Sequence, residues 1–339
     1  MATKRIGKQT VKFEKPPSII ATASIVGPKE GEGPLKEYFD TLLTDDLYGE
    51  NSWELAESKM LREAVKSAVQ KANLNITDMN YMFSGDLLNQ LMSTSFAARD
   101  LRIPFFGLYG ACSTMAEALS LGAMAIDGGY ADHIVAVTSS HFSSAERQYR
   151  FPLELGNQRP LTAQWTVTGA GAAIVSSMDR GPKITHITTG KVIDLGIKDA
   201  NNMGAAMAPA AMDTVVTHLQ DTGFSPDSYD LIVTGDLGAI GKEIMEELVM
   251  DKGYDLRGVY DDCGLLIFDN STQDTHAGGS GCGCSATVFC GYIYRKMKER
   301  VYNRVLLVST GALLSTTSAQ QGQSIPSIAH AVTITNDSV

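Results

Sequence analysis

An internal repeat constrains the fold of this 339-residue chain more than any other feature of its sequence. Residues 74–87 (LNITDMNYMFSGDL) align without a gap with residues 224–237 (FSPDSYDLIVTGDL), and both segments end in Gly-Asp-Leu. A second match places residues 133–139 over residues 304–310, and the offset grows from 150 to 171 between the two matches. Two similar copies predict a duplicated molecule with pseudo-twofold symmetry.

We place the two copies at residues 1–180 and 181–339. In a duplicated molecule, the corresponding strand ends and helix starts of both copies converge where the halves meet. We therefore expect a site at this midline, formed by residues of both halves.

The spacing of apolar residues indicates which elements each half contains. Residues 53–72 carry apolar side chains three and four positions apart, which predicts a helix, with Asn51 and Glu54 as a capping box at its start. Short buried strands alternate with helices along both halves, and the apolar run at 264–268 is one expected strand. This alternation predicts an α/β fold with one mostly parallel sheet in each half, covered on both faces.

The composition excludes several classes of protein. A net charge of −10 and a pI near 5.1 argue against binding to nucleic acid or attraction to anionic lipid, because both require clustered Lys and Arg. The basic N-terminus is not followed by the apolar stretch of a signal peptide, and no apolar run approaches the ~20 residues of a membrane span. We expect synthesis in the cytoplasm and at most peripheral contact with a membrane.

The cysteines predict neither disulfides nor a metal site. All five are expected to be reduced in a chain without an export signal. Cys282 and Cys284 are separated by one residue, which is not the C-x2-C spacing of a zinc site. We expect no cofactor and no metal bound by the protein itself.

Cys112 follows an expected strand and stands at the start of an expected helix. The N–H groups and dipole of a helix start favour a thiolate by about 1 kcal/mol, which alone lowers a thiol pKa from ~8.5 to ~7.5. Three roles are compatible with this position: a nucleophile, an anion site in which the N–H groups hold a carboxylate, and a buried structural cysteine.

The sequence around Cys112 carries a family resemblance. The Gly-Ala-Cys at 110–112, the small-residue helix after it and the glycine-rich segment 165–174 resemble the thiolase and ketoacyl synthase III superfamily. The resemblance covers nearly the whole chain. It implies a thiolase-like fold in which two α/β copies form five layers, α-β-α-β-α, and a homodimer through the first-half sheets.

Within that superfamily, the chain most resembles a family of stage V sporulation proteins of spore-forming bacteria. The assigned role of that family is to bind dipicolinic acid, pyridine-2,6-dicarboxylate, and to support its uptake into the developing spore. The resemblance implies as partners dipicolinic acid, alone or as its calcium chelate, and membrane proteins of the stage V sporulation A system. It also implies a peripheral location on the inner membrane of the forespore and spore.

The departures from the enzymes of the superfamily argue against condensing activity. Those enzymes carry Pro-His-Gln or Asn-Glu-Ala-Phe at a strand end where this chain has Thr-Gly-Asp-Leu-Gly at 234–238, so the His or Asn is absent and Asp236 lies beside the vacancy. Loss of a positioned acid-base group forfeits ~10²–10⁴ in rate. The segment 275–281 resembles the Gly-His-Pro motif of thiolases, which places His276 opposite Cys112.

The remaining candidates lie at strand ends and in the irregular segment 141–167. Arg147, Arg150 and Arg159 of that segment are candidate counter-ions for an anionic ligand. The complete set of expected ligand-binding residues is Cys112, Ser139, His141, Asp236, His276, Ser309 and Thr310.

The resemblance, together with the departures from the enzymes, implies a binding protein for dipicolinic acid or its calcium chelate that has lost the condensing machinery. Two alternatives remain open. One is an active acyl-CoA condensing or acyl-transfer enzyme that uses Cys112 and His276. The other is a purely structural member of a membrane assembly.

Overall fold

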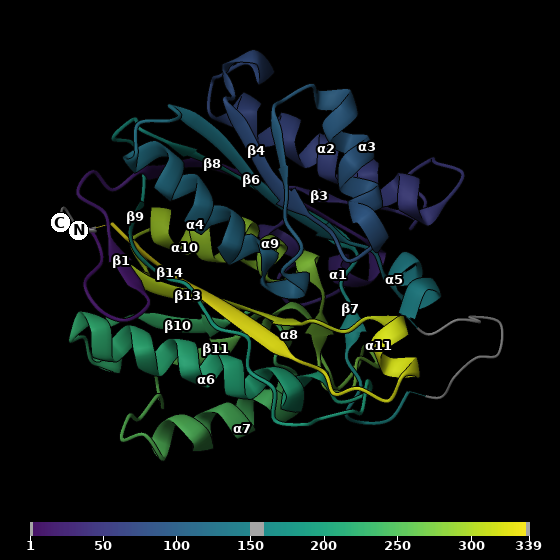
Figure 1. Cartoon of the computed structure of the whole chain (residues 1–339). Coiled ribbons are helices and arrows are strands. Elements are labelled where there is room, and N and C mark those ends of the chain that lie inside the picture. The colour runs from purple at the N-terminus through teal and green to yellow at the C-terminus, as the bar shows by residue number, and fades with distance from the viewer. Residues whose placement is uncertain (1–2, 150–158, 337–339) are drawn as a thin grey trace.

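The computed structural model describes residues 3–149 and 159–336. Figure 1 shows five layers in which two layers of strands alternate with three layers of helices. Helices α2 (Trp53–Lys71) and α3 (Met92–Leu101) cover the outer face of one strand layer. Helices α4 (Thr114–Asp127) and α9 (Cys282–Val288) fill the space between the two strand layers. The expected α-β-α-β-α arrangement is therefore confirmed.

The strands form a hydrogen-bonded path with the order β11-β10-β13-β14-β9-β2-β8-β6-β4-β5. Those of the first half are β2 (Ser18–Val26), β4 (Tyr81–Gly85), β5 (Phe105–Gly107), β6 (His133–Ser140) and β8 (Gly169–Ser176). Those of the second half are β9 (Lys183–Thr188), β10 (Leu231–Thr234), β11 (Tyr260–Asp262), β13 (Arg304–Ala312) and β14 (Ser327–Thr335). Short strands outside the path order are β1 (Thr10–Lys12), β3 (Thr41–Leu42), β7 (Trp165–Thr166) and β12 (Gly279–Ser280).

The same strand order occurs on both sides of the junction between β2 and β9. Each side contains two parallel pairs, β4 with β5 and β6 in the first half and β10 with β11 and β13 in the second. Each side also contains two antiparallel pairs, β8 with β6 and β2, and β14 with β13 and β9. Only Ser18 and Lys183 are paired between β2 and β9. The expectation of mostly parallel sheets is wrong, because the glycine-rich β8 and its counterpart β14 run against both of their neighbours.

Helices α6 (Met203–Thr222) and α7 (Gly238–Met250) cover the outer face of the second strand layer. They approach closely at Gly204 and Gly241, where an added Cβ atom on either residue would lie within 3 Å of the other helix. The remaining α-helices are α1 (Pro28–Gly31), α5 (Phe142–Tyr149), α8 (Cys263–Ile267), α10 (Tyr294–Lys298) and α11 (Thr316–Gln320).

Two local expectations are wrong. The run 264–268 is not a strand, because Asp262 accepts a hydrogen bond from the Gly264 N–H (3.0 Å) and so caps α8 directly after β11. Ser52, and not Asn51, is the N-cap of α2, and its Oγ accepts from the Leu55 N–H at 3.3 Å.

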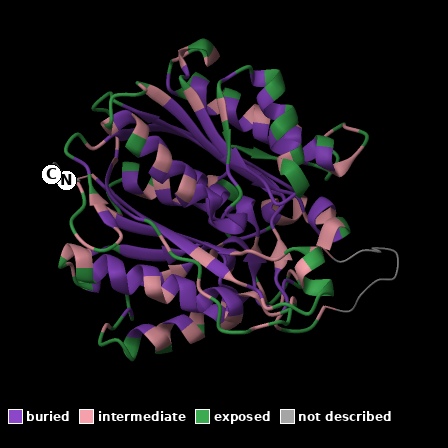
Figure 2. Cartoon of the chain, in the orientation of Figure 1, coloured by how far each residue is buried: buried purple, intermediate pink, exposed green. Residues whose placement is uncertain are grey.

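The buried residues follow the layers. In Figure 2 the strands and the inward faces of the helices are buried, and the exposed residues lie on the outer helices and connecting loops. The central helices α4 and α9 contribute Leu119 and Ala286 to the core between the sheets. Across the described residues, no helix combines the length and apolar character that crossing a membrane requires.

Candidate functional site

Cys112 lies in a single 3₁₀ turn, Ala111–Ser113, that leads into α4. Ala111 has a positive φ of 50°, a left-handed conformation that costs an L-residue about 1 kcal/mol. Gly311 at the end of β13 packs against this turn so closely that an added Cβ atom would lie 2.3 Å from the Gly110 carbonyl oxygen. The second half of the chain therefore holds the Cys112 turn in place, and a strained residue directly before a cysteine is typical of a functional position.

The Cys112 thiol lies beside the buried carboxyl group of Asp236, which stands just beyond the end of β10. One carboxyl oxygen of Asp236 accepts from the Thr310 hydroxyl at 2.7 Å. The other accepts from the Ser280 hydroxyl and the Gly281 N–H, both at 3.0 Å. Residues from both halves thus meet at one thiol and one acid, as the repeat predicts for the midline.

Asp262 fixes the turn that carries Asp236. Its carboxyl group accepts from the N–H groups of Leu237 (2.8 Å) and Gly238 (3.0 Å), and from the Thr234 hydroxyl (2.7 Å). Burial raises the pKa of Asp262 to about 7. The neighbouring strand end therefore determines where the Asp236 side chain points.

The expected lowering of the Cys112 pKa is wrong. Burial and the adjacent Asp236 carboxyl group raise the pKa of this thiol well above its ordinary value, although the Gly281 N–H acts in the opposite direction. Burial likewise raises the pKa of Asp236. A helix start contributes about 1 kcal/mol, which is too little to offset the removal of a thiolate from water. Cys112 is therefore a protonated thiol at neutral pH.

A pocket opens directly above Cys112. Helix α5 of the first half forms one wall, and the start of α6 forms the opposite wall. Its described lining residues are Leu87, Ala111, Cys112, Ala145, Glu146, Tyr149, Gln164, Thr166, Ala200, Asn201, Met203, Met207, Ser280, Ala312 and Leu314.

Gln164 and Tyr149 are the polar side chains whose orientation is most clearly fixed. The Gln164 Nε2 donates to the carbonyl oxygens of Asp236 (2.7 Å) and Gly279 (2.8 Å), which leaves its buried Oε1 without a donor among the described residues. The Tyr149 hydroxyl donates to the Leu87 carbonyl oxygen at 2.6 Å. The Gln164 amide carbonyl is an acceptor at the pocket that the described residues leave unsatisfied.

The described lining of the pocket is acidic and neutral. Among its described lining residues, Glu146 is the ionisable acid and none is Lys, Arg or His. Asp236 lies directly behind Cys112 and is 1% exposed. In the described part of the chain, no group of three His, Cys, Asp or Glu side chains is placed to hold a metal ion.

Ser139 and His141 are not among the described residues that line the pocket. The Ser139 hydroxyl donates to Glu57 Oε1 at 3.1 Å, inside the protein. His141 is 1% exposed, its Nε2–H donates to the Asp46 carbonyl oxygen at 2.8 Å, and its Nδ1 accepts from the Ser143 N–H at 3.1 Å. Burial lowers the pKa of His141, so this imidazole is a neutral structural group.

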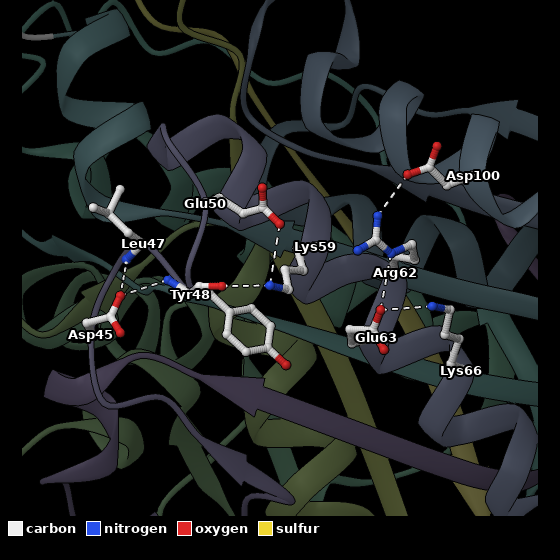
Figure 3. A network of polar contacts seen from close by, with 9 residues as sticks. All are labelled: Asp45, Leu47, Tyr48, Glu50, Lys59, Arg62, Glu63, Lys66 and Asp100. Atoms are coloured by element: carbon white, nitrogen blue, oxygen red, sulfur yellow. Dashed lines mark hydrogen bonds and ion pairs between the residues drawn. The ribbon is translucent and has the colours of Figure 1, made fainter.

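His141 contacts the loop of residues 45–50, and Figure 3 shows how this loop is held. The Asp45 carboxylate accepts from the N–H groups of Leu47 (2.9 Å) and Tyr48 (2.8 Å). Lys59 of α2 donates to the Tyr48 carbonyl oxygen at 2.7 Å and pairs with Glu50 at 3.4 Å. The loop is thus fixed to α2. The hydrogen bond between His141 and this loop, rather than a ligand, explains the position of the imidazole.

His276 does not lie opposite Cys112 in the pocket. Its Nδ1–H donates to the Pro160 carbonyl oxygen at 2.8 Å, and its Nε2 lies 3.0 Å from Asp274. His276 has a positive φ of 54°, so its backbone forms a turn that directs the ring to residues 159–160. Ser309 donates to the Ser285 hydroxyl of α9 at 3.2 Å and is fully buried. Thr310 binds Asp236 and supports the pocket from below.

Two of the three candidate arginines lie within the described residues and make different contacts. Arg147 forms an ion pair with Glu54 and lies over the Trp53 ring. Arg159 donates to the Asp274 carbonyl oxygen. Arg150 lies outside the described residues. Neither described arginine lines the Cys112 pocket.

The strand end that lacks the enzymes' His or Asn is tightly packed at Gly235. A Cβ atom on Gly235 would lie 3.0 Å from the Thr310 nitrogen and 3.1 Å from the Ser309 Cα. The backbone of β13 therefore occupies the volume that a larger residue needs at this position.

The fold assigns the chain to a structural class. The crystal structure of 3-oxoacyl-[acyl-carrier-protein] synthase III from Aquifex aeolicus VF5 matches with a TM-score of 0.58 and 14% identity, over 94% of this chain and 99% of that chain. The corresponding enzyme from Pseudomonas aeruginosa PAO1 matches with a TM-score of 0.56 and 12% identity, over 96% and 99%. The chain therefore has the fold of the thiolase-like ketoacyl synthase III enzymes.

Within this class, the chain belongs to the stage V sporulation protein AD family, whose sequence model matches residues 7–335. Stage V sporulation protein AD of Bacillus subtilis (strain 168) is 46% identical over 329 residues, which is 97% of this chain and 97% of that protein. The chain is accordingly a sporulation protein on a fold shared with condensing enzymes.

Sequence reasoning identified Cys112, Asp236 and Thr310 of the central group and missed most of the pocket wall. Ser280 lies in the glycine-rich loop that we singled out for its histidine, so the loop was a usable signal. Tyr149, Gln164 and the start of α6 carry no motif.

Proposed function

We propose that this protein binds dipicolinic acid or its calcium chelate in the Cys112 pocket during sporulation. One observation carries the proposal. A pocket lies at the cysteine of a condensing-enzyme fold, while this cysteine is held as a buried thiol against a carboxyl group and the strand end carries a tightly packed glycine in place of the enzymes' histidine. A retained pocket without the acid-base groups supports binding without turnover.

The charge of the pocket favours the calcium chelate over the free dianion. A dianion would meet Glu146 and, behind Cys112, Asp236, with no described basic side chain in the lining. Like charges at short range in a partly buried site are unfavourable, so an anion enters more easily with its own cation. Tyr149, Asn201 and Gln164 are neutral polar groups able to orient such a ligand.

Thermal unfolding with dipicolinate alone, calcium alone and both together tests this function. At a concentration 100 times Kd, ligand binding to the folded state adds about 2.7 kcal/mol. We expect the largest rise in Tm with dipicolinate and calcium together. No rise at millimolar dipicolinate, with or without calcium, would contradict binding by this chain alone.

A pair of variants locates the binding. Ala200 lines the pocket and Lys198 of the same loop does not. We expect A200W to reduce the ligand-induced rise in Tm and K198W to leave it unchanged. Equal responses of the two variants would place the ligand elsewhere.

The second candidate is acyl transfer from an acyl-CoA to Cys112, because the thiol stands at the N-terminus of α4 with backbone N–H groups nearby. Incubation with an acyl-CoA followed by mass measurement tests it, with C112A as the control. A covalent acyl group on the wild type that is absent from C112A, together with turnover, would favour the enzyme.

Three further features of the proposal concern assembly. The membrane proteins of the stage V sporulation A system are the partners, and the spore inner membrane is the location, by analogy with the family. A homodimer forms through the first-half sheet. The support is the edge strand β5, on which Phe106 is 52% exposed.

A further inference from the structure

A second pocket, with basic lining, lies between the end of α2, the strand β2 and α10. Its charged and aromatic lining consists of Tyr38, Asp40, Lys71, Tyr294, Arg295 and Lys298. It shares no lining residue with the Cys112 pocket and plays no part in the proposed ligand binding.

The cations of this pocket are only partly neutralised. Lys71 Nζ lies 2.5 Å from Asp40 Oδ1, so the acid and one lysine compensate each other. Arg295 donates to the neutral carbonyl oxygen of Glu37 at 2.9 Å and lies over the Tyr38 ring, which fixes the guanidinium without cancelling its charge. Lys298 forms no hydrogen bond or ion pair with another described side chain. Arg295 and Lys298 therefore leave an excess of positive charge at the pocket.

The surrounding sequence adds to this charge. Residues 295–304 (RKMKERVYNR) contain five Lys or Arg and one Glu, in a chain whose net charge is −10. The negative net charge does not describe this region, because basic residues are clustered on α10 and the loop after it. The pocket floor includes Cys290 and Gly291 of the π-helical turn Phe289–Ile293, and such turns occur frequently at functional sites.

We propose that this basic pocket binds a phosphate group, of the kind that an anionic phospholipid headgroup presents. Arg295 and Lys298 stand three residues apart on α10, so the guanidinium and the ammonium project to the same side of the helix and together suit the oxygens of a phosphate. Tyr38 and Tyr294 at the rim are also typical of a surface that meets lipid headgroups, and Val301 beyond α10 is 55% exposed. Binding is electrostatic and weakens with salt.

Sedimentation with lipid vesicles tests the proposal on the full chain. We expect binding to phosphatidylglycerol vesicles and none to phosphatidylcholine vesicles at the same salt concentration. Each basic residue near an anionic surface contributes about a five-fold change in binding, so K298Q should weaken it about five-fold and K298E by more. Lys252 is an exposed lysine of the second half outside the pocket, and K252E is the matched control.

A parallel titration with inorganic phosphate, followed by thermal unfolding, identifies the source of the phosphate. Vesicle binding that K298E weakens and K252E does not supports the proposal with a lipid as the ligand. A phosphate-dependent rise in Tm that only K298E abolishes supports it with a soluble ligand. Absence of both effects, or equal effects of K298E and K252E, overturns it.

Discussion

Cys112 and Asp236 come from opposite halves of the chain and meet where no water reaches the carboxyl group. Two influences act on the thiol: the helix start favours the thiolate, while burial and the neighbouring carboxyl group favour the protonated form. The second influence prevails, so the position of a cysteine at a helix start does not by itself define a nucleophile.

Removing the Asp236 carboxyl group reverses part of the rise in the pKa of Cys112. We expect D236N to lower the pKa of Cys112, because it removes a carboxyl group whose charge and hydrogen bond both raise that pKa. A pKa lower by one unit gives about ten times more thiolate at neutral pH. The measurement is the pH dependence of iodoacetamide labelling at Cys112, by mass spectrometry. D255N changes an exposed acid and serves as the control, and slower labelling of D236N than of the wild type would contradict the prediction.

Gly235 gives a second prediction at this scale. We expect G235A to destabilise the fold by about 1–3 kcal/mol, because its Cβ atom would press on the β13 backbone at Thr310. We also expect G235H to be less stable still and to show no condensing activity. Chemical denaturation measures the first effect. G31A is the control, because a Cβ atom there makes only ordinary contacts at 3.6 Å and beyond; an equal loss in both variants would contradict the argument.

At the scale of single elements, the short helix α1 is fixed through a buried acid to Thr168, the residue directly before β8. Glu30 Oε1 accepts from the Thr168 N–H at 2.9 Å, and Oε2 has no partner among the described residues. Burial raises the pKa of Glu30 to about 8. The folded protein therefore binds a proton at Glu30 that the unfolded chain loses near pH 4.5.

The sign of the pH dependence follows from this pKa. Because the folded state holds the proton more tightly, the contribution of Glu30 to stability is fully present below pH 4.5 and decreases as the pH rises to about 8. The loss is about 1.4 kcal/mol per pH unit within this window. We expect E30Q to abolish this contribution and to be more stable than the wild type at pH 8. Denaturation curves at pH 5 and pH 8 measure the difference, and an unchanged pH dependence in E30Q would contradict it.

The elements that sequence periodicity predicts best are those with long apolar faces. The helix expected at 53–72 is α2, with Trp53–Lys71 as its bounds. The strand expected at 264–268 was wrong because Gly264 and the four apolar residues after it fit a buried helix as well as a strand, and the cap from Asp262 decides between them. The antiparallel direction of β8 and β14 was also not predictable from the alternation of strands and helices. The sequence alone does not distinguish a connection that crosses a layer from one that returns directly beside the previous strand.

At the scale of the whole molecule, the repeat predicted where the site lies but not which side chains surround it. The thiol follows β5 and its acid follows β10, and these strands belong to different copies, so the contact between the two halves brings the groups together. The predictions that His276 and His141 line the pocket were wrong because local turns and loop contacts direct their rings elsewhere. The repeat carries no information on these contacts. Met203 and Met207 enter the pocket only because α6 begins beside it.

The prediction for the whole molecule concerns the proposed homodimer. β5 is the last strand on its side of the sheet path, and an exposed edge with an aromatic residue invites pairing with a second copy. We expect F106D to convert a dimer into a monomer, and light scattering after size-exclusion chromatography measures the mass. Y130D changes another exposed aromatic residue and should leave the dimer intact. A monomeric wild type would remove the dimer from the proposal.

The division of the thiol and its acid between the two halves also orders events during synthesis. Cys112 leaves the ribosome well before Asp236 and Cys282 have been made, and N-terminal segments begin to fold first. Until the second half docks, the thiol has neither the burial nor the carboxyl neighbour that suppress its ionisation in the finished protein. The interval between translation of the two halves is therefore the period in which oxidants and electrophiles reach this cysteine most readily, and docking of the second half ends it.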